Sequence, residues 1–191
     1  MNGIVKHYLS ISVTKLDKIS GWLLYPISDL IAQLIIGDVS LLRIFIVAVV
    51  GRYVYAIETP KWFGFLATWA RLNTPQGLSR FFWSKSETES TYQFNWLSKT
   101  LGTTFWFNPL WIARHMIILE LANILTGKTG FISFLPQALY LGSVSFLMQL
   151  PVTLVVNYII ICHLTERTRF FWASVFSGTL SIYYAVMKVY F

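Results

Sequence analysis

The stretch that decides the fold is residues 100–124, TLGTTFWFNPLWIARHMIILELANI. It is too apolar and too aromatic for a helix that faces water. It nevertheless carries Pro109 near its middle, followed by Arg114, His115 and Glu120. A proline removes one backbone hydrogen bond and kinks a helix, and an arginine inside hydrocarbon is costly unless it is paired or hydrated. The rest of the chain must therefore make a kinked and charged membrane helix tolerable.

The composition of the whole chain agrees with a membrane setting. Of 191 residues, 55% are apolar and only 12% are charged, and the mean hydropathy is +0.59. Soluble domains average about 25% charged residues, so this chain has too little polar surface to cover its apolar content in water. An aromatic content of 17% also fits, because Trp and Tyr collect at membrane interfaces. We expect an integral membrane protein whose first partner is the lipid bilayer.

Several other classes of protein are disfavoured. The net charge of +7 does not indicate nucleic-acid binding, because the basic residues lie in loops between apolar runs, where the positive-inside bias puts them. The single cysteine, Cys162, excludes an intrachain disulfide and a cysteine-based metal site. The first 15 residues lack both the apolar core of a signal peptide and the arginine-rich pattern of a transit peptide.

The first half of the chain divides into two membrane helices and a polar connection. We expect residues 1–19 to form an interfacial segment and residues 20–191 to form a single transmembrane domain. Residues 21–36 form the first helix, and a turn at Gly37-Asp38 ends it. Residues 41–57 form the second helix, which Thr-Pro-Lys at 59–61 ends, and an aromatic stretch at 62–70 lies in the interface. Residues 71–99 form a long polar loop.

The second half contains the opening stretch and two further helices. Residues 131–163 carry no charge and are longer than one perpendicular span requires. Pro136 and Pro151 divide them, which favours an interfacial or tilted lead-in followed by a helix at 141–161. Whether residues 131–147 span the bilayer or lie in the interface stays open. Glu166 and its basic neighbours form a loop, and residues 170–189 form the last helix.

The distribution of basic residues tests this arrangement. With the N-terminus inside, the inner side holds ten basic residues and the outer side three. The inner ones are Lys6, Lys15, Lys18, Lys61, Arg71, Arg80, Lys85, Lys99, Arg167 and Arg169, and the outer ones are Arg43, Lys128 and Lys188. The expected fold is an all-α bundle of about five transmembrane helices, some kinked, with short interfacial segments. The host is a bacterial cytoplasmic membrane or a mitochondrial inner membrane.

Two charged groups at membrane depth invite pairing. At about 1.5 Å per residue, Asp29 lies roughly 15 Å from the inner end of its helix and Arg52 roughly 12 Å from the inner end of the next. The two helices are adjacent and antiparallel, so we expect an Asp29–Arg52 ion pair. Such a pair is either purely structural or part of the lining of a polar path.

Arg114 has no partner within its own helix. Glu120 lies six residues further on and therefore faces another side, so Arg114 needs a partner elsewhere or water. His115 is either a packing histidine or a proton relay. No set of residues has metal-ligand spacing, and no catalytic triad, phosphate loop or paired carboxylate motif appears. We therefore predict no enzyme, no metal and no cofactor.

The order and spacing of short motifs resemble the family of the peroxisomal membrane protein of 22 kDa and its mitochondrial inner-membrane relatives. The matching positions are Asp29 and Gln33 for its GDxxxQ signature, then Arg43, Gly51, Trp62-Phe63, Lys99, Phe107, Pro109, Leu150-Pro151, Asn157-Tyr158 and Leu180-Ser181. The chain departs from the family at Thr103-Thr104, where the family has DQ, and at Cys162, where it has a proline. The loop at 64–98 is also longer, and a C-terminal WN is absent.

A weaker resemblance links the chain to the bacterial L-alanine exporter family. Thr104-Phe105 followed by PLWIA at 109–113 is similar to its TFQSPVYVA run, with two extra residues between. Both resemblances imply a small membrane channel or transporter.

Three functions follow as alternatives. The first is a channel or transporter for small polar, anionic or zwitterionic solutes, with amino-acid or metabolite export as an example. The residues expected to line its pathway are Asp29, Arg52, Asn108, Arg114 and Asn157, with helix kinks at Pro109 and Pro151. The second is a non-transporting scaffold or assembly partner, in which the same groups only hold helices together. The third and least favoured is an intramembrane enzyme. A homo-oligomer is compatible with all three.

Overall fold

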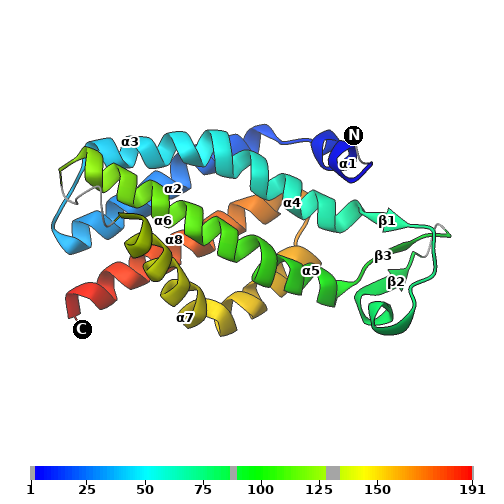
Figure 1. Ribbon diagram of the computed structural model, residues 1–191. Coiled ribbons are helices and arrows are strands. Elements are labelled where there is room, and N and C mark those ends of the chain that lie inside the picture. Colours follow the sequence, from blue (N-terminus) through cyan, green and yellow to red (C-terminus); the bar gives the residue numbers. More distant parts are fainter. Residues whose placement is uncertain (1–2, 87–89, 128–133, 191) are drawn as a thin grey trace.

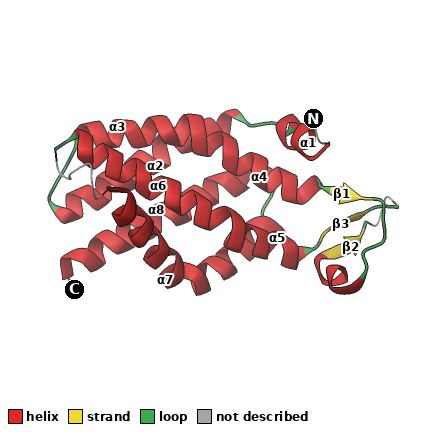
Figure 2. Ribbon diagram, viewed as in Figure 1, coloured by secondary structure: helices red, strands yellow, loops and turns green. Residues whose placement is uncertain are grey.

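The computed structural model describes residues 3–86, 90–127 and 134–190, with side chains described for 5–86, 90–127, 135–136 and 138–183. The fold is all-α apart from one small sheet (Figure 2). A short helix, α1 (Gly3–Ser10), precedes the long helix α2 (Lys15–Ile36). Helix α2 starts earlier than predicted, because Thr14 and Asp17 form a reciprocal capping box ahead of the apolar run. Gly37 ends it with φ 80°, as the predicted turn requires.

The second long segment is continuous over α3 (Leu41–Val50), a π-helical turn (Gly51–Tyr55) and α4 (Ala56–Thr68). The predicted end at 59–61 and the separate interfacial stretch at 62–70 are therefore wrong. Pro60 costs a helix interior about 3 kcal/mol. Phe63 and Leu66 are buried just beyond it, and burying two such side chains contributes roughly 3–6 kcal/mol. Tertiary packing thus outweighs the local break.

The third long segment contains the stretch from which the sequence analysis began. Helix α5 (Trp96–Gly102) leads into a second π-helical turn (Thr103–Phe107), and α6 (Asn108–Leu125) follows. Pro109 lies in the first turn of α6, directly after the π-helical turn. Each of the two composite segments therefore contains a π-helical turn with a proline shortly after it.

The last two helices are longer than the sequence suggested. Helix α7 (Phe134–His163) is a single helix, so the predicted separation into a lead-in and a span is wrong over the described residues. Pro136 lies in its first turn, where no backbone donor is needed. Pro151 lies inside the helix, whose ribbon changes direction about midway (Figure 1). Helix α8 (Glu166–Tyr190) includes Glu166, Arg167 and Arg169, which were expected in a loop.

The polar connection is more structured than its composition indicates. It forms an antiparallel sheet in the order β1-β3-β2, from β1 (Ala70–Arg71), β2 (Trp83–Lys85) and β3 (Tyr92–Phe94), with a 3₁₀ helix at Gly77–Phe82. The rings of Trp83 and Phe94 lie 4.5 Å apart across the β2–β3 pair. The Arg71 guanidinium lies 4.9 Å from the Trp83 ring centroid. Residues 87–89, in the charged run of this loop, lie outside the described residues.

The long helices run roughly antiparallel, with the chain ends at opposite ends of the bundle (Figure 1). Helix α2 packs most extensively on α8, and α6 packs on α7. A buried cluster joins α2, the α3–α4 segment and α8, and consists of Tyr25, Val47, Tyr55, Ala56 and Phe170. It holds together the elements that carry most of the polar groups at depth.

One backbone contact fixes α2 against the first π-helical turn. A Cβ atom added at Gly21 would overlap the carbonyl oxygen of Gly51, and a Cβ atom at Gly51 would overlap that of Gly21. Only glycine at both positions allows this approach. The contact sets how α2 lies beside α3 and α4.

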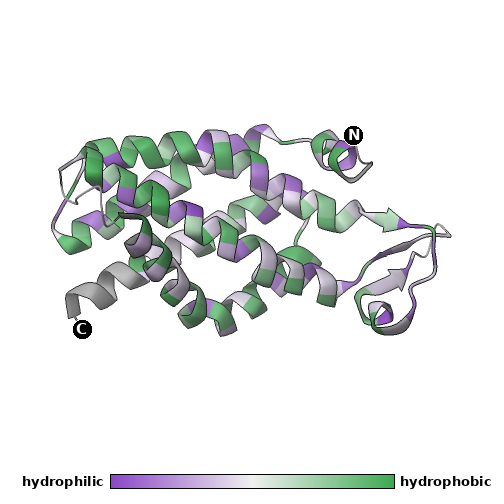
Figure 3. Cartoon of the chain, in the orientation of Figure 1, coloured by the Kyte–Doolittle hydropathy of each residue, from purple (hydrophilic) through white to green (hydrophobic). Residues whose placement is uncertain are grey.

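Two helical stretches are long and apolar enough to cross a membrane, Lys15–Ile36 and Ala138–His163. They suggest membrane association. Apolar residues also cover much of the outer side of the bundle (Figure 3). Exposed large side chains there include Leu23, Ile27, Phe45, Trp106, Leu147, Met148, Val152 and Val155.

Candidate functional site

Two adjoining cavities lie inside the bundle, between α2, α6, α7 and α8. They share the side chains of Tyr25, Trp111, His115, Met116, Ser177 and Ser181. The cavity nearer the α2–α3 turn, here called the charged cavity, has a volume of about 280 Å³. The other, here called the amide cavity, has a volume of about 90 Å³. The shared wall makes them two parts of one polar region.

The charged cavity contains a hydrogen-bonded network built on Asp29. Arg43 donates to one Asp29 oxygen from Nε at 3.1 Å and from Nη2 at 2.5 Å. Gln33 donates from Nε2 to the other oxygen at 2.6 Å. The predicted Asp29–Arg52 pair is therefore wrong. Arg43 starts α3 directly after the short turn, so its long side chain reaches back to Asp29 two turns inside α2.

Local sequence explains why this network forms. Asp29 and Gln33 are four residues apart and share a helix face. Ser40 caps α3 by accepting from the Arg43 backbone N–H at 3.3 Å, and its own N–H donates to Gln33 Oε1 at 2.6 Å. The turn between α2 and α3 is thus tied to the same network. Both partners of the ion pair are mostly buried, with side chains 20% and 8% exposed for Arg43 and Asp29.

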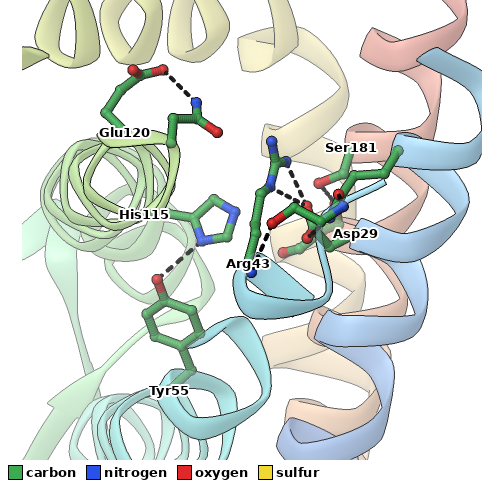
Figure 4. Close-up of polar contacts among 10 residues, drawn as sticks. Asp29, Arg43, Tyr55, His115, Glu120 and Ser181 are labelled. Carbon is green, nitrogen blue, oxygen red and sulfur yellow. Dashed lines mark hydrogen bonds and ion pairs between the residues drawn. The ribbon is translucent and has the colours of Figure 1, made fainter. Parts of the chain in front are cut away.

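The wall shared by the two cavities is aromatic and polar. His115 Nδ1 lies 3.0 Å from the Tyr55 hydroxyl, and its ring stacks on Trp111 at a centroid distance of 5.0 Å. Figure 4 shows His115 on α6 pointing toward Arg43, with Tyr55 reaching His115 from the first π-helical turn. Such turns often occur where a side chain serves a function. Here the turn places the Tyr55 hydroxyl inside the bundle.

The amide cavity is lined by uncharged polar groups. They include Asn108, Gln149, Thr153 and Asn157. Asn157 donates from Nδ2 to Thr104 Oγ1 at 2.9 Å, so the second π-helical turn also supplies a hydroxyl group to the interior. The Thr153 hydroxyl is buried and has no hydrogen-bond partner among the described residues.

The structure places Arg52 outside both cavities. Its guanidinium lies 5.6 Å from the ring centroids of both Trp22 and Tyr53. Cation–π contacts stabilise an arginine at an aromatic, partly exposed position without a carboxylate partner. Arg52 therefore does not lie where the predicted solute pathway needs it.

Arg114 also lies outside both cavities. It forms an ion pair with Glu58 of α4 at 2.7 Å, and the two side chains are 40% and 28% exposed. Its Nε also donates to the Leu110 carbonyl oxygen at 3.2 Å. The Tyr8 hydroxyl of α1 donates to the Glu58 carbonyl oxygen at 3.4 Å. Burial raises the pKa of Tyr8, and the Glu58 carboxylate raises it further.

Of the five residues predicted to line a pathway, Asp29, Asn108 and Asn157 line a cavity. Sequence reasoning missed Arg43, Glu120 and Gln149 as lining residues. Arg43 was placed at an interface because it starts a helix, although the helical rise leaves it within reach of Asp29. Glu120 was noted as a charge at depth, and only the packing of α6 on α7 turns it inward.

No group of three or more His, Cys, Asp or Glu residues that could hold a metal ion occurs in the described part of the chain. The lone Cys162 is a partly buried free thiol. No family model, curated protein or solved structure matches this chain. The site must therefore be interpreted from its own geometry.

Proposed function

We propose that this protein is a small multi-pass membrane channel or transporter that carries a small polar solute through the interior of its helix bundle. The observation that carries the proposal is the pair of adjoining cavities, which bring charged, amide and hydroxyl groups together inside the bundle. Ionisable groups at membrane depth are expensive and characteristically line substrate pathways. The cavities lie between helices, where bundles build their ligand sites.

The distribution of polarity supports a membrane setting for these cavities. Large apolar side chains are exposed on the outer sides of α2, α3, α6 and α7, whereas Asp29, Gln33, Gln149 and Asn157 are buried. Exposed apolar area of this extent is a liability in water. In a bilayer it faces the lipid tails. The five long helical segments would then each cross the membrane, with the N- and C-termini on opposite sides.

The motif resemblance adds a second line of support. Asp29, Gln33 and Arg43, three positions of the motif shared with the peroxisomal membrane protein of 22 kDa family, meet in one network. Asn157 bonds to Thr104, where that family has its DQ pair. Membership of that family, and of the weaker L-alanine exporter candidate, stays a prediction.

A non-transporting scaffold is the second candidate, and one observation favours it. Most polar groups at depth pair with one another across helices, as in Asp29–Arg43, Asn157–Thr104 and Tyr55–His115. Pairing of this kind also holds helices together within lipid. A scaffold has no need for the space between these groups, whereas a transporter has.

Reconstitution into liposomes tests the proposal. Purified protein would be inserted into liposomes loaded with a zwitterionic amino acid, a small amine, a dicarboxylate or a sugar, and release of each solute followed over time. We expect release above the rate of protein-free liposomes for at least one solute. Ser177→Trp, which fills a position shared by both cavities, should abolish the release while Val155→Trp, on the outer side of α7, should not. A folded protein that releases none of the solutes would favour the scaffold.

A further inference from the structure

We infer that the charged cavity recognises the ammonium group of a small solute through the carboxylate of Glu120. This inference deepens the proposed function and rests on it, since a solute must reach the cavity. It concerns the class of solute, which the sequence analysis left among polar, anionic and zwitterionic molecules.

Glu120 is the group in the charged cavity that is least satisfied by the protein. Its residue is only 8% exposed, and it lines the cavity from α6. One carboxylate oxygen accepts a hydrogen bond from Asn123 Nδ2 at 3.3 Å. The other, Oε2, is buried and has no hydrogen-bond partner among the described residues. A buried carboxylate oxygen without a donor is costly, and a donor from a bound solute would remove that cost.

The remaining charges of the cavity favour a cation at this position. Asp29 and Arg43 compensate each other, because Arg43 donates twice to one Asp29 oxygen. Among the charged residues lining the cavity, −1 for Asp29, +1 for Arg43 and −1 for Glu120 give a sum of −1. The aromatic rings of Tyr25 and Trp111 line the same cavity, and the faces of such rings attract cations. An anion would meet an uncompensated carboxylate instead.

This result reverses the lean toward anionic solutes. That lean rested on Arg52 and Arg114, neither of which lines a cavity. The volume of about 280 Å³ lies near the lower end of the usual range for small-molecule sites. The solute is therefore small. A short aliphatic amine or a zwitterionic amino acid fits, with its apolar part against Ala32, Leu119 and Leu141.

The test combines binding with flux in Glu120→Gln, which keeps the shape of the side chain and removes its charge. The matched control is Glu166→Gln, which changes an exposed carboxylate at the start of α8 away from the cavity. Binding of n-propylamine, L-alanine and succinate would be measured by the ligand-induced shift of the melting temperature in detergent. Release of the same three solutes would be measured in liposomes.

We expect the wild-type protein and Glu166→Gln to bind at least one ammonium-bearing solute and not succinate. Glu120→Gln should weaken that binding about 10- to 100-fold, the range to which a hydrogen bond to a charged group corresponds. Without solute, Glu120→Gln should melt at the wild-type temperature or higher, because it removes an uncompensated buried charge. A loss of binding caused by misfolding would instead lower the melting temperature.

The outcomes separate this inference from the proposed function. Unchanged amine binding in Glu120→Gln, or a preference of the wild-type protein for succinate, would overturn the inference while leaving transport intact. Binding of neither ammonium-bearing solute to the wild-type protein would also overturn it. Glu120-dependent binding without release from liposomes would uphold the ammonium site and overturn the transport function.

Discussion

The molecule holds two ion pairs between helices, and they differ in what surrounds them. Asp29–Arg43 is mostly buried, joined to Gln33 and Ser40, and lines the charged cavity. Glu58–Arg114 is nearly as short, but it is about a third exposed and lies outside both cavities. The same chemistry therefore serves two purposes. The first pair lines the interior site, whereas the second helps to join α4 and α6 where α1 packs on α4.

The comparison teaches that depth along a helix is not enough to identify a pathway residue. Arg114 and Asp29 both lie inside apolar segments of the sequence. The direction in which each side chain points, and not its distance from the helix end, decides which of them faces the cavity. Direction depends on the packing of neighbouring helices and on the π-helical turns.

The largest effect should follow from Asp29→Ala. It leaves the Arg43 guanidinium largely buried without a counter-charge, and breaking a buried pair in this way costs about 3–5 kcal/mol. The free energy of unfolding in mixed micelles would measure the loss. Asp29→Ala combined with Arg43→Ala should recover part of it, because the uncompensated charge is then gone. A single variant as stable as the wild type would show that the network contributes nothing.

The next effect tests how α2 is held beside Arg43. Gly51→Ala forces a Cβ atom against the Gly21 carbonyl oxygen, and such overpacking costs about 1–3 kcal/mol. It should also weaken the binding of any solute in the charged cavity, since Asp29 and Arg43 lie on the displaced helices. The control is Gly102→Ala, where the added atom would lie 3.7 Å from Leu66 and 3.9 Å from Trp62. Equal stability of the two variants would contradict the role of the glycine contact.

A smaller effect is expected from Tyr55→Phe. The variant removes the hydroxyl group that pairs with His115, and a hydrogen bond of this kind contributes about 0.5–1.5 kcal/mol. Melting in detergent would measure the cost. The wall shared by both cavities should keep its shape, so solute binding should change less than in Gly51→Ala. A collapse of binding in Tyr55→Phe would instead assign His115 a direct role toward the solute.

The smallest effect should come from Glu58→Ala. A partly exposed ion pair contributes about 0.2–1 kcal/mol, and Arg114 keeps its bond to the Leu110 carbonyl oxygen. Unfolding in the same micelles would place this variant well above Asp29→Ala in stability, with solute release unchanged. If Glu58→Ala proved the more damaging of the two, the distinction between the pairs would be wrong.

Much of the helical architecture is predictable from the sequence, whereas its joints are not. Apolar runs and the Gly37 turn locate the long helices. Pro60 reads locally as a terminator, yet buried Phe63 and Leu66 carry the helix through it. Likewise, no local pattern announces a π-helical turn, because its hydrogen bonds depend on tertiary packing. The small sheet arises from contacts such as Trp83 with Phe94, which are distant in sequence.

The site was predictable only in part for the same reason. Asp29 and Gln33 share a helix face by spacing alone, so one half of the network follows from the sequence. The other half, Arg43, depends on the short turn that brings α3 back along α2. Arg52 has the right depth for a partner of Asp29 but points to Trp22 and Tyr53. Rotation about the helix axis, which spacing between helices does not determine, separates the two arginines.

The central claim is that the interior cavities are hydrated and the apolar outer side faces lipid. Cysteine accessibility in membranes tests both halves at once. In a Cys162→Ser background, Ser177→Cys places a thiol in the wall shared by the cavities, and Val155→Cys places one on α7 where the side chain is 60% exposed. A charged, water-soluble thiol reagent should label Ser177→Cys and spare Val155→Cys. Labelling of Val155→Cys with protection of Ser177→Cys would contradict the account.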